Sequence, residues 1–277
     1  MTAILVFDIE TVPDLAAVRR TCEVPADLCD ADVAAWFAQS RRVATGSDFA
    51  PLYLQKVVAI GCAVRDGPRF RIGSLGEVGD DEPDLLRRFF ELVDRFTPQL
   101  VSWNGSGFDL PVLHHRALIH GVPAARYWEW GDDDRDFRYN NYLSRYHTRH
   151  LDVMDVLAAY QPRANAPLDA MARLCGFPGK LGMDGSEVAA AVAAGRLAEV
   201  RAYCETDVLN TYLLYQRFRL MRGEVDAAAY AAEISFIRER IAASDAPHWR
   251  AYLAAWDGAA TRGEPRPATG APRAAAG

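Results

Sequence analysis

The chain has 277 residues, of which half are hydrophobic and a quarter charged, and its formal net charge is −6. This composition is typical of a soluble globular protein with one large domain or two small ones. The acidic balance argues against a protein that binds nucleic acid indiscriminately through a basic surface, but it does not exclude an enzyme that meets nucleic acid through metal ions.

Cysteine usage and the opening residues indicate the compartment. The five cysteines form no CxxC pair, so we predict reduced, mostly buried thiols in a cytoplasmic protein. The opening MTAILVFDIE has no basic leader, and an acid interrupts its apolar run, so we expect no signal peptide. No segment has the length of a transmembrane helix, and we expect no membrane association.

The first part of the chain predicts an antiparallel meander. Residues 4–10 form a continuous apolar run ending in acids, which is typical of a strand buried on both faces. Residues 13–55 hold short helical pieces and turn residues, and we interpret them as an insertion. Residues 56–66 and 69–75 predict two more strands around a Gly-Pro turn, the last of them an edge strand.

The middle of the chain alternates helices and strands. Residues 81–96 have apolar side chains at helical spacing, residues 99–103 predict a short strand, and residues 110–121 predict a helix. Residues 122–149 are rich in aromatic and charged side chains without periodicity, which indicates a long loop or insertion. Residues 150–160 predict a short strand that runs into a helix.

From residue 167 onward the pattern is helical. Asp184 and Glu187 have the spacing of a capping box, and residues 197–223 are the clearest helix. Residues 257–277 have little to bury, so we expect disorder. The order of elements predicts an α/β fold, with a mixed five-stranded sheet of antiparallel and parallel strands, flanking helices and a helical C-terminal part.

Two acids end the first strand. Asp8 and Glu10 are two residues apart, so their side chains project from the same face of the strand. Carboxylates are the ligands that Mg²⁺ prefers in proteins. Alone, the pair is better explained as two acids at a water-exposed strand end.

Three more residues fit the same chemistry. Asp109 follows a strand and starts a helix, where a helix N-cap is the structural alternative. Tyr203 and Asp207 are four residues apart on one helix face, which we expect at the edge of the core, facing the rim of the sheet. Each observation has an ordinary structural explanation when it is taken alone.

Taken in chain order, the motifs resemble a known superfamily. "DIE" after the first strand, "NGSGFD" after a later strand and "YCETD" on a late helix resemble the three motifs of the DEDD superfamily of 3′–5′ exonucleases. Tyr203 places the chain with the tyrosine subclass (DEDDy), since Ala202 stands where histidine members carry His. "WNGSGFDLPVLHHRA" is similar to the proofreading domain of family B DNA polymerases and to stand-alone bacterial predicted exonucleases related to it.

This resemblance implies a ribonuclease H-like fold and a two-metal mechanism with Mg²⁺ or Mn²⁺. It implies that Asp8 bridges the metals, that Glu10 and Asp207 hold the metal carrying the attacking water, and that Asp109 holds the second. Tyr203 would orient the water, because a phenol with a pKa near 10 is a poor base at neutral pH. The implied reaction releases nucleoside 5′-monophosphates from the 3′ end of single-stranded DNA. An exoribonuclease, or a non-catalytic nucleic-acid-binding protein that keeps the fold, remains an alternative.

The resemblance also implies substrate contacts and a domain division. Ile9 and Thr11 are expected to line the pocket for the terminal nucleotide, Asn104 and Phe108 to contact the penultimate one, and Lys180 to contact phosphate. Phe108 as a core residue and Lys180 as a solvated loop residue are the structural alternatives. We expect an exonuclease domain at 1–222 with the insertions 13–55 and 122–149, a helical extension at 223–256 and a disordered tail at 257–277.

Other candidate sites are weaker. His147, His150 and Asp152 could suggest zinc, but their spacing is loose, so we interpret the histidines as part of a surface loop and Asp152 as an acid near the sheet edge. His114 and His115 follow Asp109 on a helix and do not suit a nucleophilic triad. The sequence contains neither G-x-S-x-G nor a Walker-type loop.

Overall fold

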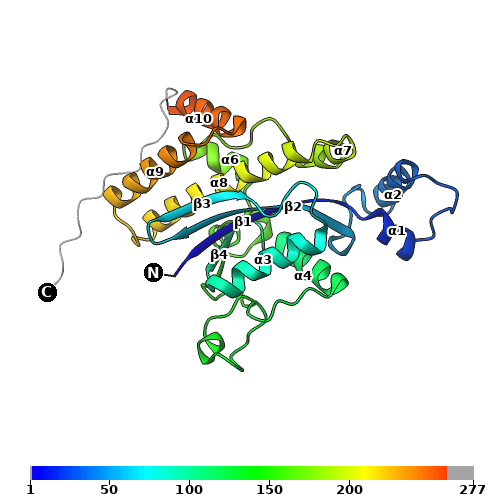
Figure 1. Cartoon of the computed structure of the whole chain (residues 1–277), viewed down its shortest axis with the longest axis horizontal. Helices are drawn as coiled ribbons and strands as arrows, with labels where there is room; N and C mark the ends of the chain where they lie inside the picture. Colours follow the sequence, from blue (N-terminus) through cyan, green and yellow to red (C-terminus); the bar gives the residue numbers. More distant parts are fainter. Residues whose placement is uncertain (1, 261–277) are drawn as a thin grey trace.

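The computed structural model describes residues 2–260 and contains one mixed sheet flanked by helices (Figure 1). The first three strands in the chain pair antiparallel, and the last two extend the sheet from the first strand in parallel. The strands are β1 (Ile4–Pro13), β2 (Gln55–Asp66), β3 (Arg69–Ser74), β4 (Gln99–Ser102) and β5 (His150–Asp152), in the order β3-β2-β1-β4-β5. The predicted mixed five-stranded sheet with flanking helices is confirmed, and so is the position of β3 as an edge strand.

Helices cover both faces of the sheet. The α-helices are α1 (Leu15–Thr21), α2 (Asp30–Thr45), α3 (Glu82–Phe96), α4 (Asp109–His120), α5 (Val153–Leu157), α6 (Leu168–Leu174), α7 (Val188–Ala193), α8 (Leu197–Met221), α9 (Ala227–Ala242) and α10 (Pro247–Ala260). In Figure 1, α3 and α4 lie on one side of the sheet, and α8 lies on the other with α6, α9 and α10 beyond it.

The central strand β1 divides its side chains between two cores. Leu5, Phe7 and Ile9 belong to the core beneath α3 and α4, whereas Val6 belongs to the core around α8. This is the two-residue alternation of a strand covered on both faces. The same alternation directs the side chains of Asp8 and Glu10 toward α8.

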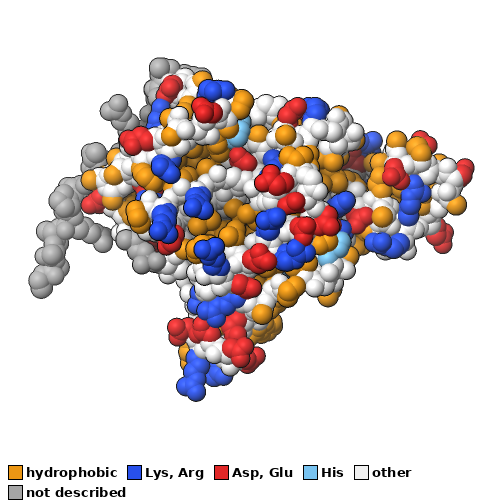
Figure 2. All heavy atoms as spheres, in the orientation of Figure 1, with side chains coloured by type: hydrophobic (Ala, Val, Ile, Leu, Met, Phe, Trp, Pro, Cys, Tyr) orange, Lys and Arg blue, Asp and Glu red, His pale blue; other side chains and the backbone are white. Residues whose placement is uncertain are grey.

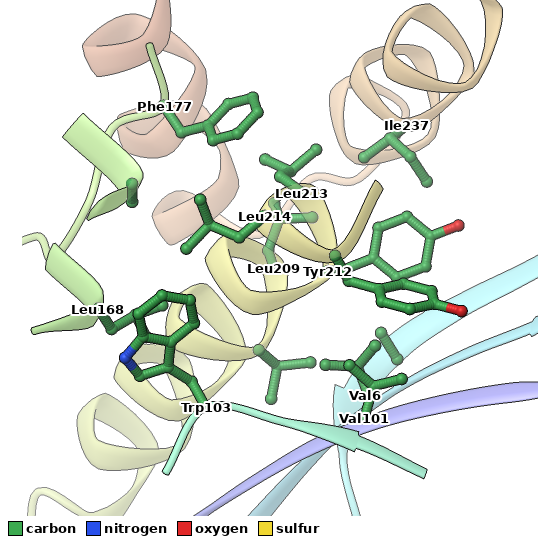
Figure 3. Close-up of a cluster of buried hydrophobic side chains, with 14 of the residues drawn as sticks. Val6, Val101, Trp103, Leu168, Phe177, Leu209, Tyr212, Leu213, Leu214 and Ile237 are labelled. Carbon is green, nitrogen blue, oxygen red and sulfur yellow. The ribbon is translucent and has the colours of Figure 1, made fainter. Parts of the chain in front are cut away.

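Helix α8 is the centre of the second core. Figure 3 shows Val6 and Val101 from the sheet facing Leu209 and Tyr212 of α8, with Ile237 of α9 beyond them. Helix α10 joins the same core, and the hydroxyl of Tyr252 donates to Asn210 Oδ1 at 2.6 Å. Helices α9 and α10 therefore stabilise the position of α8, while the domain division at residue 222 stays a prediction.

The C-terminal half is less continuously helical than expected. Residues 175–184 form a loop, because Gly176, Gly179 and Gly182 have φ angles of 85°, 74° and 78°, which a right-handed helix does not allow. The predicted capping box of Asp184 and Glu187 is confirmed, at the start of a 3₁₀ turn before α7.

The expected tail is wrong at its start. Helix α10 extends to Ala260, so residues 257–260 are helical, and residues 261–277 lie outside the described part of the chain. The helix continues because Trp249, Tyr252 and Trp256 anchor it on α8 and α9, a tertiary contact that composition does not reveal.

The two predicted insertions differ in character. Helices α1 and α2, with the η1 turn (Leu52–Leu54), pack around their own small core and stand off one end of the sheet (Figure 1), and we call residues 14–54 the arm. Residues 122–149 form a long loop as expected, with only a short 3₁₀ turn, η2 (Arg135–Arg138). Its side chains of Tyr127 and Tyr142 stack at 5.4 Å and are buried against α3 and α4.

A buried ion-pair network joins the arm to the body. Arg116 of α4 is only 2% exposed, and its Nη1 lies 2.8 Å from Asp14 Oδ2 at the root of the arm. The same guanidinium pairs with Glu82 at the start of α3. Glu82 also accepts a hydrogen bond from the backbone N–H of Val57 at 2.6 Å, which links the network to β2.

The surface of the protein carries charges of both signs. On the face in Figure 2, acidic and basic side chains are interspersed rather than gathered by sign. None of the described helices is long and apolar enough to cross a membrane. The cysteines are free, as expected, but only Cys62 and Cys204 are buried, and Cys29 is exposed, so the prediction of mostly buried thiols is wrong.

Candidate active site

The two acids of β1 meet the middle of α8. Ligand atoms of Asp8, Glu10 and Cys204 all lie within 4.8 Å of one another. The thiol of Cys204 lies 3.4 Å from the backbone oxygen of Asp8 and 3.6 Å from its Oδ2. Directly after Glu10, the pairing of β1 with β2 is interrupted by a register shift. The acids therefore occupy the last regular part of the strand.

Helix α8 lies directly on the sheet, because β2 has a glycine beneath it. A Cβ atom at Gly61 would lie 2.9 Å from both Cys204 Sγ and Val208 Cγ2. Tyr203 and Asp207 are consequently buried, with 4% and 3% of their surface exposed. They are more deeply buried than the expected place at the edge of the core implies, although both line an open cleft.

Asp109 joins the acids from a third element. Its Oδ1 accepts a hydrogen bond from the backbone N–H of Ile9 at 3.0 Å, between the two acids of β1. The N-cap position of α4 belongs to Phe108, with no side-chain cap, so Asp109 is not the helix cap. Its side chain points across to β1.

Asp152 fixes the loop that presents Asp109. Its two carboxylate oxygens accept the backbone N–H groups of Asn104 and Ser106, each at 2.9 Å. It also accepts from the N–H of Asp155 as the N-cap of α5. Asp152 is therefore a positioning residue, a role that its place near the sheet edge did not reveal.

Lys180 reaches the acids from the loop between α6 and α7. Its Nζ lies 3.1 Å from Asp207 Oδ2 and donates to the hydroxyl of Tyr203. Its backbone N–H donates to Asp169 Oδ1 at 2.7 Å, which holds the loop in place. Lys180 is thus a partner of two site residues, and not the solvated loop lysine of the structural alternative.

These side chains surround one open cleft with a volume of about 740 Å³. Nine of the predicted site residues line it: Asp8, Ile9, Glu10, Asn104, Phe108, Asp109, Lys180, Tyr203 and Asp207. Thr11 does not line the cleft, and its hydroxyl donates to Gln55 Oε1 at 3.0 Å. Trp103, Asn165 and Arg173 also line the cleft and were not anticipated, although Trp103 directly precedes Asn104 in the second motif.

Burial and mutual repulsion perturb the acids. Burial, reinforced by the charges of Asp109 and Glu10, raises the pKa of Asp8 well above its usual value. The pKa of Glu10 is raised by burial and by Asp207. Burial raises the pKa of Asp109 to about 7 and raises that of Asp207, where Lys180 opposes the shift. Without a cation the acids therefore favour their protonated form, and a bound cation would stabilise the charged form.

The donor set suits a hard divalent ion. Asp207 Oδ1 is buried and has no hydrogen-bond partner among the described residues, whereas Oδ2 pairs with Lys180. Leaving a buried polar atom without a partner is costly. Burial and the nearby acids raise the pKa of the Cys204 thiol, which keeps it neutral and a poor ligand. The available donors are carboxylate oxygens, the ligands of Mg²⁺ and Mn²⁺.

The histidines outside the cleft form no comparable cluster. His147 Nδ1 accepts from the N–H of Asn141 at 2.9 Å, while His150 is buried in β5 with its Nε2 2.8 Å from Ser102 Oγ. The interpretation of His150 as part of a surface loop is therefore wrong. The ring of His114 lies between those of Tyr127 and Trp128, at 5.0 and 4.9 Å.

The chain is similar to exonuclease domains of family B polymerases. Residues 47–256 match the family model described as "Predicted 3′–5′ exonuclease related to the exonuclease domain of PolB". The chain is 27% identical over 146 residues to the catalytic subunit of DNA polymerase epsilon from Saccharomyces cerevisiae, which covers 50% of this chain and 6% of that protein. A family B DNA polymerase structure from the archaeon Pyrobaculum calidifontis aligns with a TM-score of 0.47 and 20% identity, covering 80% of this chain and 25% of that one.

The chain thus spans only a small part of these polymerases. The family model covers most of the sequence, including the motifs that contribute Asp109, Tyr203 and Asp207 to the cleft. The chain therefore belongs to the family of predicted 3′–5′ exonucleases related to the exonuclease domain of PolB.

Proposed function

We propose that the protein is a metal-dependent 3′–5′ exonuclease that removes nucleoside 5′-monophosphates from the 3′ end of single-stranded DNA. The observation that carries this proposal is the convergence of four carboxylates and a tyrosine in one cleft. They come from β1, α4 and α8, three elements far apart in the sequence. We further propose that residues 1–222 form the catalytic domain and that the protein acts in the cytoplasm.

Asp8, Glu10, Asp109 and Asp207 would hold two divalent ions, Mg²⁺ or Mn²⁺. When bound, two such ions supply an activated water and stabilise the leaving oxygen of a phosphodiester. The protein contributes rigidity. Asp8 and Glu10 are fixed on a central strand, and Asp109 is fixed by its hydrogen bond from Ile9 N–H. Such support keeps ligand geometry within the narrow limits that catalysis needs.

Tyr203 orients the attacking water rather than deprotonating it. Burial and the charges of Asp207 and Glu10 raise the pKa of its phenol above the usual value, so the hydroxyl keeps its proton at neutral pH. A protonated phenol is a hydrogen-bond donor and acceptor, not a general base.

Lys180 supplies a positive charge next to the reaction. Burial lowers the pKa of its ammonium, but the charge and the hydrogen bond of Asp207 together with the charges of Asp8 and Glu10 outweigh this effect, so the pKa is raised and the group stays charged. A charged lysine within reach of Asp207 is suited to contact the scissile phosphate. Asn104 and Phe108, which line the same cleft, would contact the nucleotide, with the ring of Phe108 stacking on a base.

One assay tests the proposal. Oligonucleotides of DNA and of RNA, labelled at either end, are incubated with the full chain and Mg²⁺ or Mn²⁺, and then with a chelator. Metal-dependent shortening of DNA from the 3′ end is the expected result. Preference for RNA would make the protein an exoribonuclease, and binding without cleavage would contradict catalysis. A contaminating nuclease is excluded if Asp207→Asn abolishes the activity.

A further inference from the structure

An exposed aromatic ring of the arm lies at the edge of the cleft. The rings of Phe49 and Phe108 are in contact, with centroids 5.9 Å apart and planes tilted by 53°. Phe108 lines the cleft beside Asp109 and rests on the core beneath α3 and α4. Phe49 is 53% exposed. The two rings therefore lead from the acids toward solvent.

The backbone around Phe49 is fixed from the arm. Its carbonyl accepts a hydrogen bond from Arg41 Nε at 3.2 Å, and its N–H donates to Ser47 Oγ at 3.2 Å. The next residue, Ala50, is buried in the core of the arm. The backbone that carries the Phe49 ring is thus fixed by these contacts, which lowers the entropy cost of binding a ligand.

A buried chain of hydrogen bonds joins this segment to the catalytic strand. Thr11, directly after Glu10, donates to Gln55 Oε1 at 3.0 Å, and Gln55 Nε2 donates to the carbonyl of Ala50 at 3.1 Å. Gln55 is buried. Phe49 is therefore held at a defined position relative to the acids, and Thr11, expected to touch substrate, instead positions the segment that carries Phe49.

We propose that Phe49 extends the cleft of the proposed exonuclease with an aromatic subsite that stacks on a base upstream of the 3′-terminal nucleotide. This inference rests on the proposed function and specifies how the single strand leaves the site. Phe49 lies one ring beyond Phe108, so the base that it meets is the second or third from the end. Stacking on an aromatic ring tolerates any base, as an exonuclease requires.

The surroundings of Phe49 favour nucleic acid as the ligand. The guanidinium of Arg41 is anchored only through Nε, and its terminal nitrogens make no hydrogen bond to other described residues. A cation beside a single exposed ring suits a base and its adjoining phosphate.

Tyr53 provides a matched control. It is also an aromatic residue of the arm, and 52% of its surface is exposed. It has no ring contact with Phe108 among the described residues. Phe49→Ala and Tyr53→Ala therefore remove similar exposed rings and differ in their relation to the cleft. Equal melting temperatures of the two variants would show that both remain folded.

Binding is measured on the full chain carrying Asp8→Ala, with Mg²⁺ present, so that the oligonucleotide stays intact. Fluorescence anisotropy with a 5′-labelled oligothymidylate gives Kd. Loss of one stacked base weakens binding about tenfold, so we expect this effect for Phe49→Ala, little change for Tyr53→Ala and retention for Phe49→Trp. The fluorescence of 2-aminopurine at the second or third position from the 3′ end should be quenched by the protein that keeps Phe49 and not by the Phe49→Ala variant.

The outcomes separate the two proposals. If Phe49→Ala and Tyr53→Ala bind equally well, or if quenching does not depend on Phe49, the subsite is wrong even when the wild-type protein cleaves DNA. If wild type binds in a Phe49-dependent way but never cleaves, the subsite stands and the exonuclease proposal fails. Absence of any oligonucleotide binding overturns the subsite as well.

Discussion

Lys180 Nζ lies 3.1 Å from Asp207 Oδ2, so a lysine ammonium compensates one of the acids proposed to hold a divalent ion. The same ammonium donates to the hydroxyl of Tyr203. A divalent ion that binds Asp207 must therefore share this carboxylate with Lys180 or displace it. The lysine has two opposed effects, because it weakens ion binding while it provides a charge for the substrate phosphate.

Lys180→Met should bind Mg²⁺ more tightly and cut DNA more slowly. Removing a positive charge near the carboxylates is expected to lower the apparent Kd for Mg²⁺ by roughly three- to tenfold, since close like charges in a half-buried site repel appreciably. Titration calorimetry at pH 8 measures this affinity. Arg173→Met is the control, because Arg173 lines the same cleft but pairs with Asp169. An unchanged Mg²⁺ affinity in Lys180→Met would show that Lys180 does not compete with Mg²⁺ for the carboxylate of Asp207.

Tyr203→Phe should leave a slow enzyme, whereas Asp8→Ala should leave essentially none. The phenylalanine keeps the packing of the ring and loses only the hydroxyl that orients water, so we expect a decrease in kcat of roughly ten- to a hundredfold. Asp8 contributes a carboxylate that no neighbour replaces. Single-turnover cleavage of a labelled oligonucleotide measures both rates. Wild-type rates in Asp8→Ala would end the proposed mechanism.

Without divalent ions, the protein should lose stability as the pH rises through the site acids. The pKa of Asp109 is about 7 in the folded protein, compared with about 3.9 for an unperturbed aspartate. The folded state therefore binds more protons between these values, so the free energy of unfolding falls from about pH 4 to about pH 7. In Asp109→Asn the free energy of unfolding should fall less over this pH range, by a few kcal/mol. This estimate follows because each unit of difference between the folded and unfolded pKa corresponds to about 1.4 kcal/mol.

Urea unfolding at pH 5 and pH 8 in chelator checks this prediction. His114 and His150 act in the opposite sense, because burial lowers their pKa values to about 4 and about 3. The contribution of these histidines to the pH dependence cancels when Asp109→Asn is compared with wild type, since both proteins contain His114 and His150. Added Mg²⁺ should restore wild-type stability at pH 8. Equal losses of stability in wild type and Asp109→Asn would show that Asp109 does not carry the effect.

Gly61→Ala should impair activity through the position of α8. The new methyl group would meet Cys204 Sγ and Val208 Cγ2 at 2.9 Å, on the helix that carries Tyr203 and Asp207. Overpacking of this kind costs about 1–3 kcal/mol, and a displaced helix would separate its side chains from β1. Gly73→Ala on β3 is the control, because nothing lies within 4 Å of its added Cβ. Melting temperature and kcat measure the two effects, and equal kcat values for both variants would be incompatible with this tight contact.

The strands and most cleft residues were predictable because their signals are local. A continuous apolar run identifies β1, and its two-residue period places Asp8 and Glu10 on one face. The depth of Tyr203 and Asp207 was not predictable, because it depends on Gly61, a residue of another strand. Thr11 was misplaced because the pairing of β1 shifts directly after Glu10. Lys180 lies in the loop between α6 and α7, and Asp152 binds backbone groups of the loop before α4. No periodicity encodes the paths of these loops.

The ion-pair network of Arg116 makes the arm inseparable from the nuclease body. Shortening the chain by joining β1 directly to β2 would remove Asp14 and leave a buried guanidinium with fewer acids. Loss of one partner from a buried pair is strongly destabilising. The damage would fall on α4, the helix that begins with Asp109. The arm, although it lies outside the sheet, is thus required for the correct position of α4 and Asp109. A shortened version of this protein without the arm would therefore also need a replacement of Arg116.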